Sequence, residues 1–318
     1  MAVKKKLLSI IIPAFNEADN IERTYKVLLE TLKTLARKYD YEIIFTDNHS
    51  TDDSFEILQR LGRLDRRVKA IRFSRNFGYQ KSILTGYLNA SGAAAIQVDC
   101  DLQDPPEIII EFVRKWEQGA AVVYGVRRTR KENWLINTLR KLFYRIVAVL
   151  SEDTLPVDAG DFRLVDRKII EELKRMEDAT PYLRGAIATM GYEQIGVPYD
   201  RAERDIGESK FSFSGYFKLA VDGIVNHSVI PLRIATYVGL VISVITFLAI
   251  IVYILLRIFV GANWPSGFTT ITIFLLLSIS LNALFLGVIG EYLARIFKQV
   301  KKRSLTLVEN TVNFQNKT

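Results

Sequence analysis

The sequence predicts an α/β fold, with a mostly parallel sheet covered by helices on both faces, followed by two transmembrane helices. In residues 1–229, short apolar runs alternate with segments of helical spacing, and the runs are apolar at consecutive positions. This pattern is typical of parallel strands buried on both faces. Two uncharged stretches of 23 residues follow, at 234–256 and 268–290. The chain therefore divides into a strand–helix domain (1–229), a two-helix hairpin (230–290) and a basic tail (291–318).

The strand–helix alternation can be followed element by element. Strands are expected at the apolar, β-branched runs 7–12, 42–46, 68–73, 93–98 and 120–125. Helices are expected where apolar residues recur with helical spacing, at 21–35, 54–64, 80–90 and 106–118. Pro13 is expected to end the first strand, because proline cannot donate a hydrogen bond to the ladder. Polar motifs follow the first four strands, at the carboxyl ends where such sheets bind ligands.

Each uncharged stretch is long enough to cross a membrane. At ~1.5 Å rise per residue, a helix of this length spans about 34 Å, against a hydrocarbon core of ~30 Å. The connector 257–267 contains glycine, asparagine and proline, which predicts a turn between two spans. Asn282, the strongly polar residue of the second stretch, is expected to face the partner helix. A buried hairpin in a soluble protein is the less favoured alternative, because both stretches reach the spanning length.

The net charge of +8, from 43 basic and 35 acidic residues, is concentrated beside these stretches. Residues 230–318 carry eight Lys or Arg and two Asp or Glu, whereas residues 1–229 are nearly balanced. This distribution argues against nucleic-acid binding and for a membrane surface. The basic cluster from Arg295 to Arg303 is expected to be cytoplasmic, which places both termini in the cytoplasm. The apolar run after Lys6 is too short for a secretory signal.

The composition restricts the kinds of metal site that the chain can form. A single cysteine, Cys100, excludes a disulfide scaffold and a Cys-based zinc site. Only two histidines are present, which disfavours a centre with several His ligands. Any metal ion would be held by carboxylates, and carboxylates favour Mg²⁺ or Mn²⁺.

The first two strands are each followed by polar side chains. Asn16 and Glu17 come after Pro13, where they either contact a ligand or form an ordinary helix start. Asp47 ends the second strand and could accept hydrogen bonds from a base or a ribose. Residues 50–53 are better explained as caps of the next helix.

The acidic run after the fourth strand is the most specific local signal. Because strand side chains alternate faces, Asp99 and Asp101 are expected to project to the same side, ~6–7 Å apart. Two carboxylates at this separation repel each other unless a cation lies between or beside them. A divalent ion that bridges a pyrophosphate would meet this need. The alternative is a loop of acidic helix caps, and Pro106 then begins the next helix in the usual way.

Two further motifs allow more than one interpretation. Arg75 and Lys81, on either side of Gly78, either contact phosphate or belong to a solvated loop. Asp158 and Asp161 either approach an acceptor or, in the case of Asp161, form a structural ion pair with Arg163.

Cationic and amphipathic segments lie between the sheet and the first apolar stretch. Arg201, Arg204 and Lys210 suit an anionic group at a membrane interface, or general attraction to anionic lipid. Residues 133–150 and 213–229 have the spacing of amphipathic helices that lie on a bilayer or pack against the domain's own sheet.

Together, these motifs resemble the GT-A-fold, family 2 glycosyltransferases that load sugars onto polyprenyl phosphates. The family includes dolichyl-phosphate mannose synthases and bacterial glucosyltransferases of the GtrB type, whose two-span C terminus is similar to that of this chain. The resemblance covers residues 1–230 and is carried by Pro13, Asn16, Glu17, Asp47, Arg75, Asn76, Gly78 and the segments 99–106, 160–164 and 207–212. The chain departs from the family where Asp47-Asn48-His49-Ser50 replaces Asp-Asp-Gly-Ser, and where Lys210-Phe211-Ser212 replaces Lys-Tyr-Ser.

The resemblance implies a role for each motif. The nucleotide sugar would be bound by Pro13, Asn16, Glu17, Asp47, Arg75, Asp99 and Gln103. The metal, Mg²⁺ or Mn²⁺, would be held by Asp99 and Asp101. Asp101, Asp158 and Asp161 would lie at the reaction centre, and the acceptor phosphate would meet Arg127, Arg130, Arg201, Arg204 and Lys210.

The implied reaction is inverting, metal-dependent transfer of a hexose from a nucleotide sugar to a polyprenyl phosphate. The GtrB-like branch favours UDP-glucose as the donor and undecaprenyl phosphate as the acceptor. It also implies a homo-oligomer, with a tetramer as the expected form. The two uncharged stretches predict an integral membrane protein. The tail 304–318 is expected to be mobile or held by a neighbouring subunit. One alternative is a processive polysaccharide synthase, but the Gln-x-x-Arg-Trp motif is absent and two spans are few for a polymer channel. Another is a non-catalytic membrane protein that binds sugar nucleotides and regulates a partner.

Overall fold

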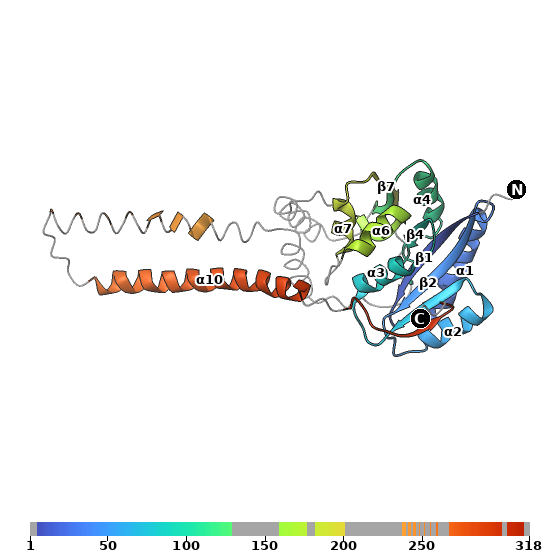
Figure 1. The fold of residues 1–318 in the computed structure, drawn as a ribbon, viewed down its shortest axis with the longest axis horizontal. Coiled ribbons are helices and arrows are strands. Elements are labelled where there is room, and N and C mark those ends of the chain that lie inside the picture. Colours follow the sequence, from blue (N-terminus) through green and yellow to red (C-terminus); the bar gives the residue numbers. More distant parts are fainter. Residues whose placement is uncertain are drawn as a thin grey trace. The chain divides into compact units, whose positions relative to one another are not determined.

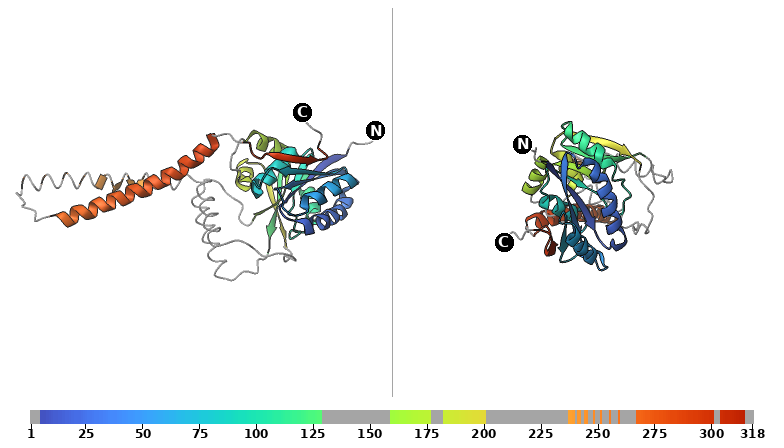
Figure 2. Two further views of the ribbon diagram at one scale, coloured as in Figure 1. Left: turned by 90° about the horizontal axis from the view of Figure 1, so that it is seen from below. Right: turned by 90° about the vertical axis from the view of Figure 1, so that its right-hand side faces the viewer.

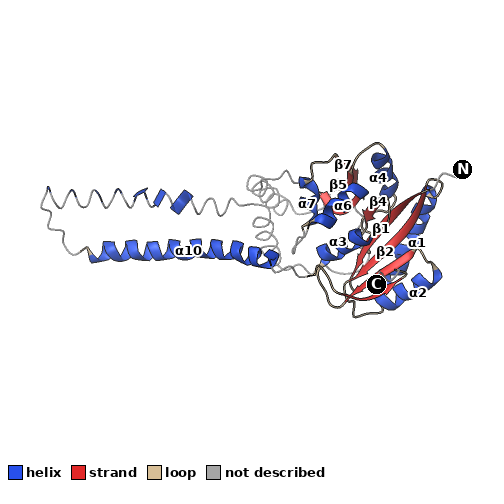
Figure 3. Ribbon diagram, in the orientation of Figure 1, coloured by secondary structure: helices blue, strands red, loops and turns tan. Residues whose placement is uncertain are grey.

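A computed structural model describes residues 5–128, 159–176, 182–200, 267–300 and 304–314, with runs of one to three helical residues between 237 and 259. The chain forms two compact units. One unit contains the sheet and the helices packed on it, and the other contains the long helix α10 (Phe268–Val300). Figure 1 labels most of the elements, and Figure 3 colours them by type.

The described part of the chain forms one mixed sheet of eight strands, in the spatial order β7-β5-β6-β4-β1-β2-β3-β8. Strands β1 to β4 are parallel neighbours, whereas β6 and β8 run antiparallel to the strands beside them. The strands are β1 (Lys6–Ala14), β2 (Tyr39–Asp47), β3 (Val68–Phe73), β4 (Ala94–Gln97), β5 (Val122–Arg127), β6 (Ala159–Asp166), β7 (Gln194–Tyr199) and β8 (Val308–Val312).

Helices cover both faces of this sheet (Figure 2). One buried cluster contains Ile10 and Ile12 of β1, and the other contains Ile11, because successive strand residues point to opposite faces. The first cluster is completed by α1 (Ala18–Leu35), α2 (Ser54–Leu64) and α4 (Ile108–Glu117). The second is completed by α3 (Tyr79–Asn89), α6 (Arg167–Arg175) and α7 (Leu183–Thr189).

The predicted α/β fold with a mostly parallel sheet is confirmed, and the elements expected between residues 7 and 125 all form. The prediction that Pro13 ends the first strand is wrong. Strand β1 continues through Pro13, which pairs with Thr46 of β2. The ladder with β4 on the other side of β1 already ends at the pair Ile11–Gln97, so the missing N–H of proline disrupts no bond to β4.

Strand β6 is the main departure from a purely parallel sheet. It inserts between β4 and β5 and runs antiparallel to both. Its amino end therefore lies at the same edge of the sheet as the carboxyl ends of β1 to β4. This arrangement brings the segment that begins at Ala159 to the edge where ligands bind.

The C-terminal segment was expected to be mobile or held by a neighbouring subunit, and the structure corrects this expectation. Residues Val308–Val312 form β8, which pairs antiparallel with β3 of the same chain. The preceding helix α10 extends past residue 290 to Val300.

Within the residues described here, no helix has both the length and the hydropathy that a membrane span requires. The predicted span 234–256 lies mostly outside the described residues, whereas 268–290 falls within α10. Asn282 is exposed on α10, and its side-chain amide donates to the carbonyl of Ser278 one turn earlier, at 2.9 Å. The predicted amphipathic segments 133–150 and 213–229 lie outside the described residues.

Candidate active site

The candidate site lies at the carboxyl edge of the parallel strands. Asp47 ends β2, and Asp99 follows β4 by two residues. In the antiparallel pair of β4 and β6, Gln97 lies opposite Arg163. Asp161, two residues before Arg163, is therefore placed beside Asp99, two residues after Gln97. The sheet thus gathers carboxylates from segments far apart in the sequence.

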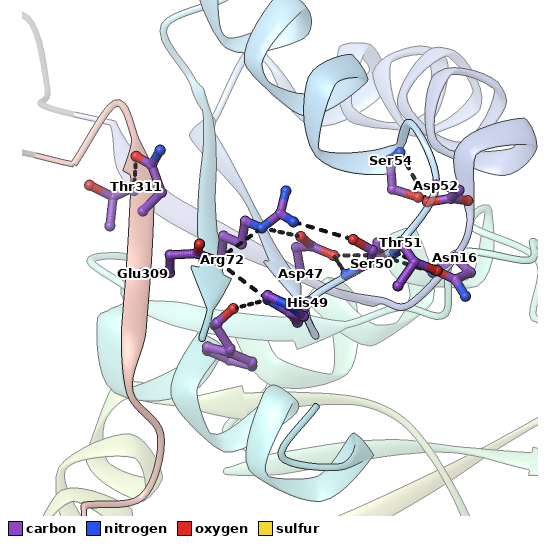
Figure 4. A network of polar contacts seen from close by, with 12 residues as sticks. Asn16, Asp47, His49, Ser50, Thr51, Asp52, Ser54, Arg72, Glu309 and Thr311 are labelled. Atoms are coloured by element: carbon purple, nitrogen blue, oxygen red, sulfur yellow. Dashed lines mark hydrogen bonds and ion pairs between the residues drawn. The ribbon is translucent and has the colours of Figure 1, made fainter. Parts of the chain in front are cut away.

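Asn16 and Glu17 join the loop after β1 to the loop after β2. The side-chain oxygen of Asn16 accepts a hydrogen bond from the backbone N–H of Thr51 at 2.8 Å, as Figure 4 shows. The backbone N–H of Asn16 donates to Ser50 Oγ, and that of Glu17 to Ser54 Oγ, both at 2.9 Å. These contacts fix the two loops to each other. Nucleotide binding by Pro13, Asn16 and Glu17 stays a prediction.

Asp47 has the geometry of a ligand-binding carboxylate. Its side chain is fully buried, and Oδ1 accepts hydrogen bonds from the N–H and the hydroxyl of Ser50, at 3.0 and 2.5 Å. Oδ2 is buried without a hydrogen-bond donor, and Arg72 Nε is 3.8 Å away. Burial raises the pKa of Asp47, although Ser50 and Arg72 act in the opposite direction. A buried acceptor without a donor is costly, so Oδ2 suits an N–H or O–H group of a ligand.

The departure from Asp-Asp-Gly-Ser at His49 has a structural explanation. His49 has φ = 63°, a left-handed backbone conformation that glycine adopts most easily. The histidine is held in this conformation by its side chain, whose Nδ1 lies 3.0 Å from the carbonyl oxygen of Phe73. The loop therefore has a backbone conformation suited to the glycine of the family pattern.

Asp99 and Asp101 lie in the turn after β4 and not on the strand, because β4 ends at Gln97. The argument from strand alternation therefore does not apply to them. Asp99 Oδ1 accepts hydrogen bonds from the hydroxyl of Tyr79 and, at 2.8 Å, from the side-chain amide of Gln97. Asp101 Oδ1 accepts a longer bond of 3.2 Å from the backbone N–H of Gln103.

The electrostatics around Asp99 fit a cation. Burial, together with the charges of Asp104, Asp101 and Asp161, raises the pKa of Asp99 to about 6, and the hydrogen bond from Tyr79 opposes this rise. Among the described residues, no cluster of three or more His, Cys, Asp or Glu side chains could hold a metal. Mg²⁺ commonly takes only one or two protein carboxylates and completes its shell with phosphate oxygens and water. Asp99 and Asp101 fit this pattern.

Asp161 is held in an ion pair, and its partner is Arg184 of α7. Arg184 Nε and Nη2 donate to the two carboxylate oxygens of Asp161 at 3.0 and 2.8 Å. Burial by itself would raise the pKa of Asp161, but the hydrogen bonds and charge of Arg184 outweigh it and lower the pKa. The predicted alternative partner, Arg163, donates instead to the carbonyl of Gly160 at 2.8 Å. A carboxylate of low pKa is a weak general base, so Asp161 is better suited to orienting a group than to removing a proton.

The predicted phosphate-binding cations differ in their surroundings. Arg75 is exposed and lies over the ring of Phe77, 4.1 Å from its centroid. Arg127, at the end of β5, is largely buried, and its Nε donates to the hydroxyl of Tyr199 at 3.2 Å. Its Nη2 is 3.7 Å from Asp104 Oδ2. Arg127 therefore braces the acidic loop in this structure, and its contact with an acceptor phosphate stays a prediction.

Several predicted site residues cannot be placed, and several placed residues were not predicted. Asp158, Arg130, Arg201, Arg204 and Lys210 lie outside the described residues. Tyr79, Gln97, Arg184 and Arg72 contact the predicted carboxylates but were not identified as site residues. Gln97 could have been found, because a glutamine inside the apolar run 93–98 is an unusual strand residue. Arg184 could not, because its partner is distant in the sequence.

Comparison with known proteins identifies relatives over nearly the whole chain. The sequence profile of the family described as Glycosyl transferase family 2 matches residues 9–174. The uncharacterized glycosyltransferase YkcC of Bacillus subtilis is 39% identical over 97% of this chain and 95% of its own length. The bactoprenol glucosyl transferase of Shigella phage SfII is 32% identical over 96% of this chain and 98% of its own.

Among solved structures, the mannosyltransferase PcManGT from Pyrobaculum calidifontis, in complex with GDP-Man and Mn²⁺, is 16% identical. The structural match covers 94% of this chain and 87% of the mannosyltransferase chain, with a TM-score of 0.48. The family profile spans more than half of the chain, and the relatives match nearly all of it. The chain is therefore a member of glycosyltransferase family 2.

Proposed function

We propose that the chain transfers glucose from UDP-glucose to undecaprenyl phosphate, with inversion at the anomeric carbon and release of UDP. The observation that carries the proposal is the nearly full-length match to proteins named bactoprenol glucosyl transferases, at 31–33% identity. The carboxylates gathered at the carboxyl edge of the sheet suit a nucleotide diphosphate.

Different described residues would bind different parts of the donor. Asp47 Oδ2, buried without a hydrogen-bond donor, would accept a hydrogen bond from the nucleoside. Asp99 and Asp101 would hold Mg²⁺ or Mn²⁺, which when bound supplies positive charge to the departing diphosphate. Gly78, with φ = 94°, is the N-cap residue just before α3, and the open space beside it would leave room for the diphosphate.

The acceptor needs little activation. A phosphate monoester has a second pKa near ~6, so its oxygen is largely ionised at neutral pH. A strong general base is therefore unnecessary, which is consistent with the low pKa of Asp161. We propose that Asp161 and Asp158 orient the reacting groups. The cations Arg127, Arg130, Arg201, Arg204 and Lys210 are the candidates for the acceptor phosphate.

The acceptor is a lipid, so the proposal includes an integral membrane protein with two spans, 234–256 and 268–290. Helix α10 supports this, because Ile271, Phe274 and Leu286 are large apolar side chains that are mostly exposed. The sheet unit and both termini would lie on the cytoplasmic side. We further propose a homo-oligomer, with a tetramer as the expected form.

The proposal can be tested with the full chain purified in detergent. Undecaprenyl phosphate, Mg²⁺ or Mn²⁺, and a panel of radiolabelled UDP- and GDP-sugars are supplied, and label that enters the organic phase is counted with and without EDTA. Transfer of one label per lipid from UDP-glucose, abolished by EDTA, is the expected result. Long products would indicate a polysaccharide synthase. Nucleotide binding without transfer from any donor would indicate a non-catalytic binding protein.

Binding of Mn²⁺ to the nucleotide-free protein is expected to weaken at acid pH. Because the pKa of Asp99 is raised to about 6, a proton competes with the metal below that pH. The affinity should fall about tenfold per pH unit below pH 6 and change little above pH 7. Isothermal titration of Mn²⁺ between pH 5 and 8 measures this. A flat profile would exclude Asp99 as a ligand.

Reversing the charge of Lys210 is expected to act on the lipid acceptor. Lys210→Glu should raise the KM for undecaprenyl phosphate at least about tenfold, because a charge-assisted contact is replaced by repulsion. The KM for UDP-glucose should stay within about twofold. Lys26→Glu, which reverses the charge of an exposed residue on α1, is the control. Equal loss of donor binding would contradict the acceptor role.

A further inference from the structure

The C-terminal strand is built into the edge of the sheet that carries Asp47. Strand β8 pairs with β3, so that Asn310 lies opposite Arg72, and the N–H of Ser74 donates to the carbonyl of Leu307 at 2.9 Å. The strand is anchored at its end by Asn313, whose amide donates to the carbonyls of Gly62 and Val68 at 2.7 and 2.8 Å. A segment more than 200 residues away in the sequence thus becomes a neighbour of the candidate donor site.

One side chain of β8, Glu309, contacts the surroundings of Asp47. Glu309 Oε2 is 3.2 Å from Arg72 Nε and 3.3 Å from His49 Nδ1. Arg72 in turn lies 3.8 Å from Asp47 Oδ2 and donates to the carbonyl of Ser50 at 3.3 Å. Figure 4 shows the Arg72 guanidinium between the two carboxylates, with the loop that contains His49 and Ser50 beside it.

The geometry gives Glu309 a specific effect on Asp47. At 3.8 Å, Arg72 stabilises the Asp47 carboxylate without donating a hydrogen bond to Oδ2. If Arg72 moved closer, it would form a full ion pair and occupy that oxygen. Glu309 attracts the same Nε from the opposite side and so holds the guanidinium away. The stacking of Arg72 on the ring of Phe55, 4.8 Å from its centroid, limits its movement in other directions.

We propose that Glu309 is a positioning residue for the donor nucleotide. It acts through Arg72, which it holds too far from Asp47 Oδ2 to donate a hydrogen bond to that oxygen. The inference rests on the proposed function, because Asp47 is the residue expected to accept a hydrogen bond from the nucleoside. The C-terminal strand would then contribute to the donor site through Arg72.

The test compares Glu309→Gln with Thr311→Ala in the full chain. Thr311 is an exposed residue on the same strand and serves as the control. Glu309→Gln should raise the Kd for UDP and the KM for UDP-glucose about three- to fivefold, as expected for loss of a partly exposed ion pair. The kcat and the KM for undecaprenyl phosphate should stay within about twofold. Thr311→Ala should change none of these constants. Unaltered UDP binding by Glu309→Gln would overturn the proposal.

Two further measurements separate positioning from simple loss of stability. Val312→Ala removes packing of β8 against Gly62, and it should lower the Tm without changing the Kd for UDP. Arg72→Lys combined with Glu309→Gln should bind UDP no more weakly than Arg72→Lys alone, because Glu309 acts through Arg72. If the losses of UDP affinity in the two single variants add in the double variant, Glu309 does not act through Arg72.

Failure of the proposed donor can be distinguished from failure of this inference. If the wild-type chain binds GDP and not UDP, the UDP-glucose assignment fails, and the same comparison is made with GDP. Glu309→Gln must then weaken GDP binding, or the inference is wrong. If the wild-type chain binds neither nucleotide, both are wrong.

Discussion

Replacing Asp101 by asparagine is expected to reduce sugar transfer at least about a hundredfold while the fold stays intact. Asparagine retains the side-chain oxygen that accepts the 3.2 Å hydrogen bond from the N–H of Gln103, so the local turn should persist. It loses the negative charge that Asp101 would contribute to a divalent ion beside Asp99. Because this ion is proposed to supply positive charge to the departing diphosphate, the loss should fall on kcat.

The measurement is transfer of label from UDP-glucose to undecaprenyl phosphate, with circular dichroism and thermal unfolding as tests of the fold. Glu107→Gln is the matched control, because Glu107 is an exposed carboxylate that follows the same acidic loop. It should keep activity within about twofold. A well-folded Asp101→Asn protein with near wild-type turnover would mean that Asp101 holds no catalytic metal.

The part of the fold that could be predicted is the part determined by local pattern. Residues 7–125 alternate between strand and helix with short connections, and parallel neighbours such as β1 and β2 follow each other closely in the chain. The antiparallel insertion of β6 and the pairing of β8 with β3 are different. They join segments separated by about 70 and 240 residues, and a strand pattern alone does not identify its partner.

The residues of the candidate site also fall into those that the sequence predicts and those that only the structure reveals. Asp47, Asp99 and Asp101 could be identified because they lie at, or within four residues after, the carboxyl end of a buried strand, which is where parallel sheets bind ligands. The ion pair of Asp161 could not be assigned correctly, because Arg163 is near in sequence while Arg184 is near in space. The left-handed backbone at His49 is visible only in the structure, where it explains how histidine replaces the glycine of the family pattern.

The second large effect is expected on stability, at the ion pair that joins β6 to α7. Arg184→Met leaves Asp161 as a buried carboxylate close to Asp99, without its bidentate partner. Breaking a fully buried pair costs ~3–5 kcal/mol. Arg184 is about one-third exposed, which reduces the expected loss to about 2 kcal/mol. For a domain of this size, that corresponds to a fall in Tm of about 4–8 °C at pH 7.

This loss should depend on pH, with a sign that follows from the pKa of Asp161. In the wild-type chain the pKa of Asp161 is lowered, so the pair stabilises the fold above pH ~4 and loses this effect as pH falls through the folded-state pKa. In Arg184→Met, burial raises that pKa, so protonation at low pH relieves the penalty. The difference in Tm between the two proteins should therefore be largest at pH 7 and narrow towards pH 4.

Thermal unfolding in detergent at pH 7, 5 and 4 measures the difference, and two variants show whether charge is its cause. Asp161→Asn combined with Arg184→Met removes both charges and should recover part of the lost stability. Lys174→Met breaks only the surface pair with Glu171, so it should shift the Tm by no more than about 1–2 °C. If the Arg184→Met deficit is the same at every pH, the cost comes from lost packing of the arginine side chain. The Asp161 carboxylate would then not depend on Arg184 for its charge, and a general-base role for it would have to be reconsidered.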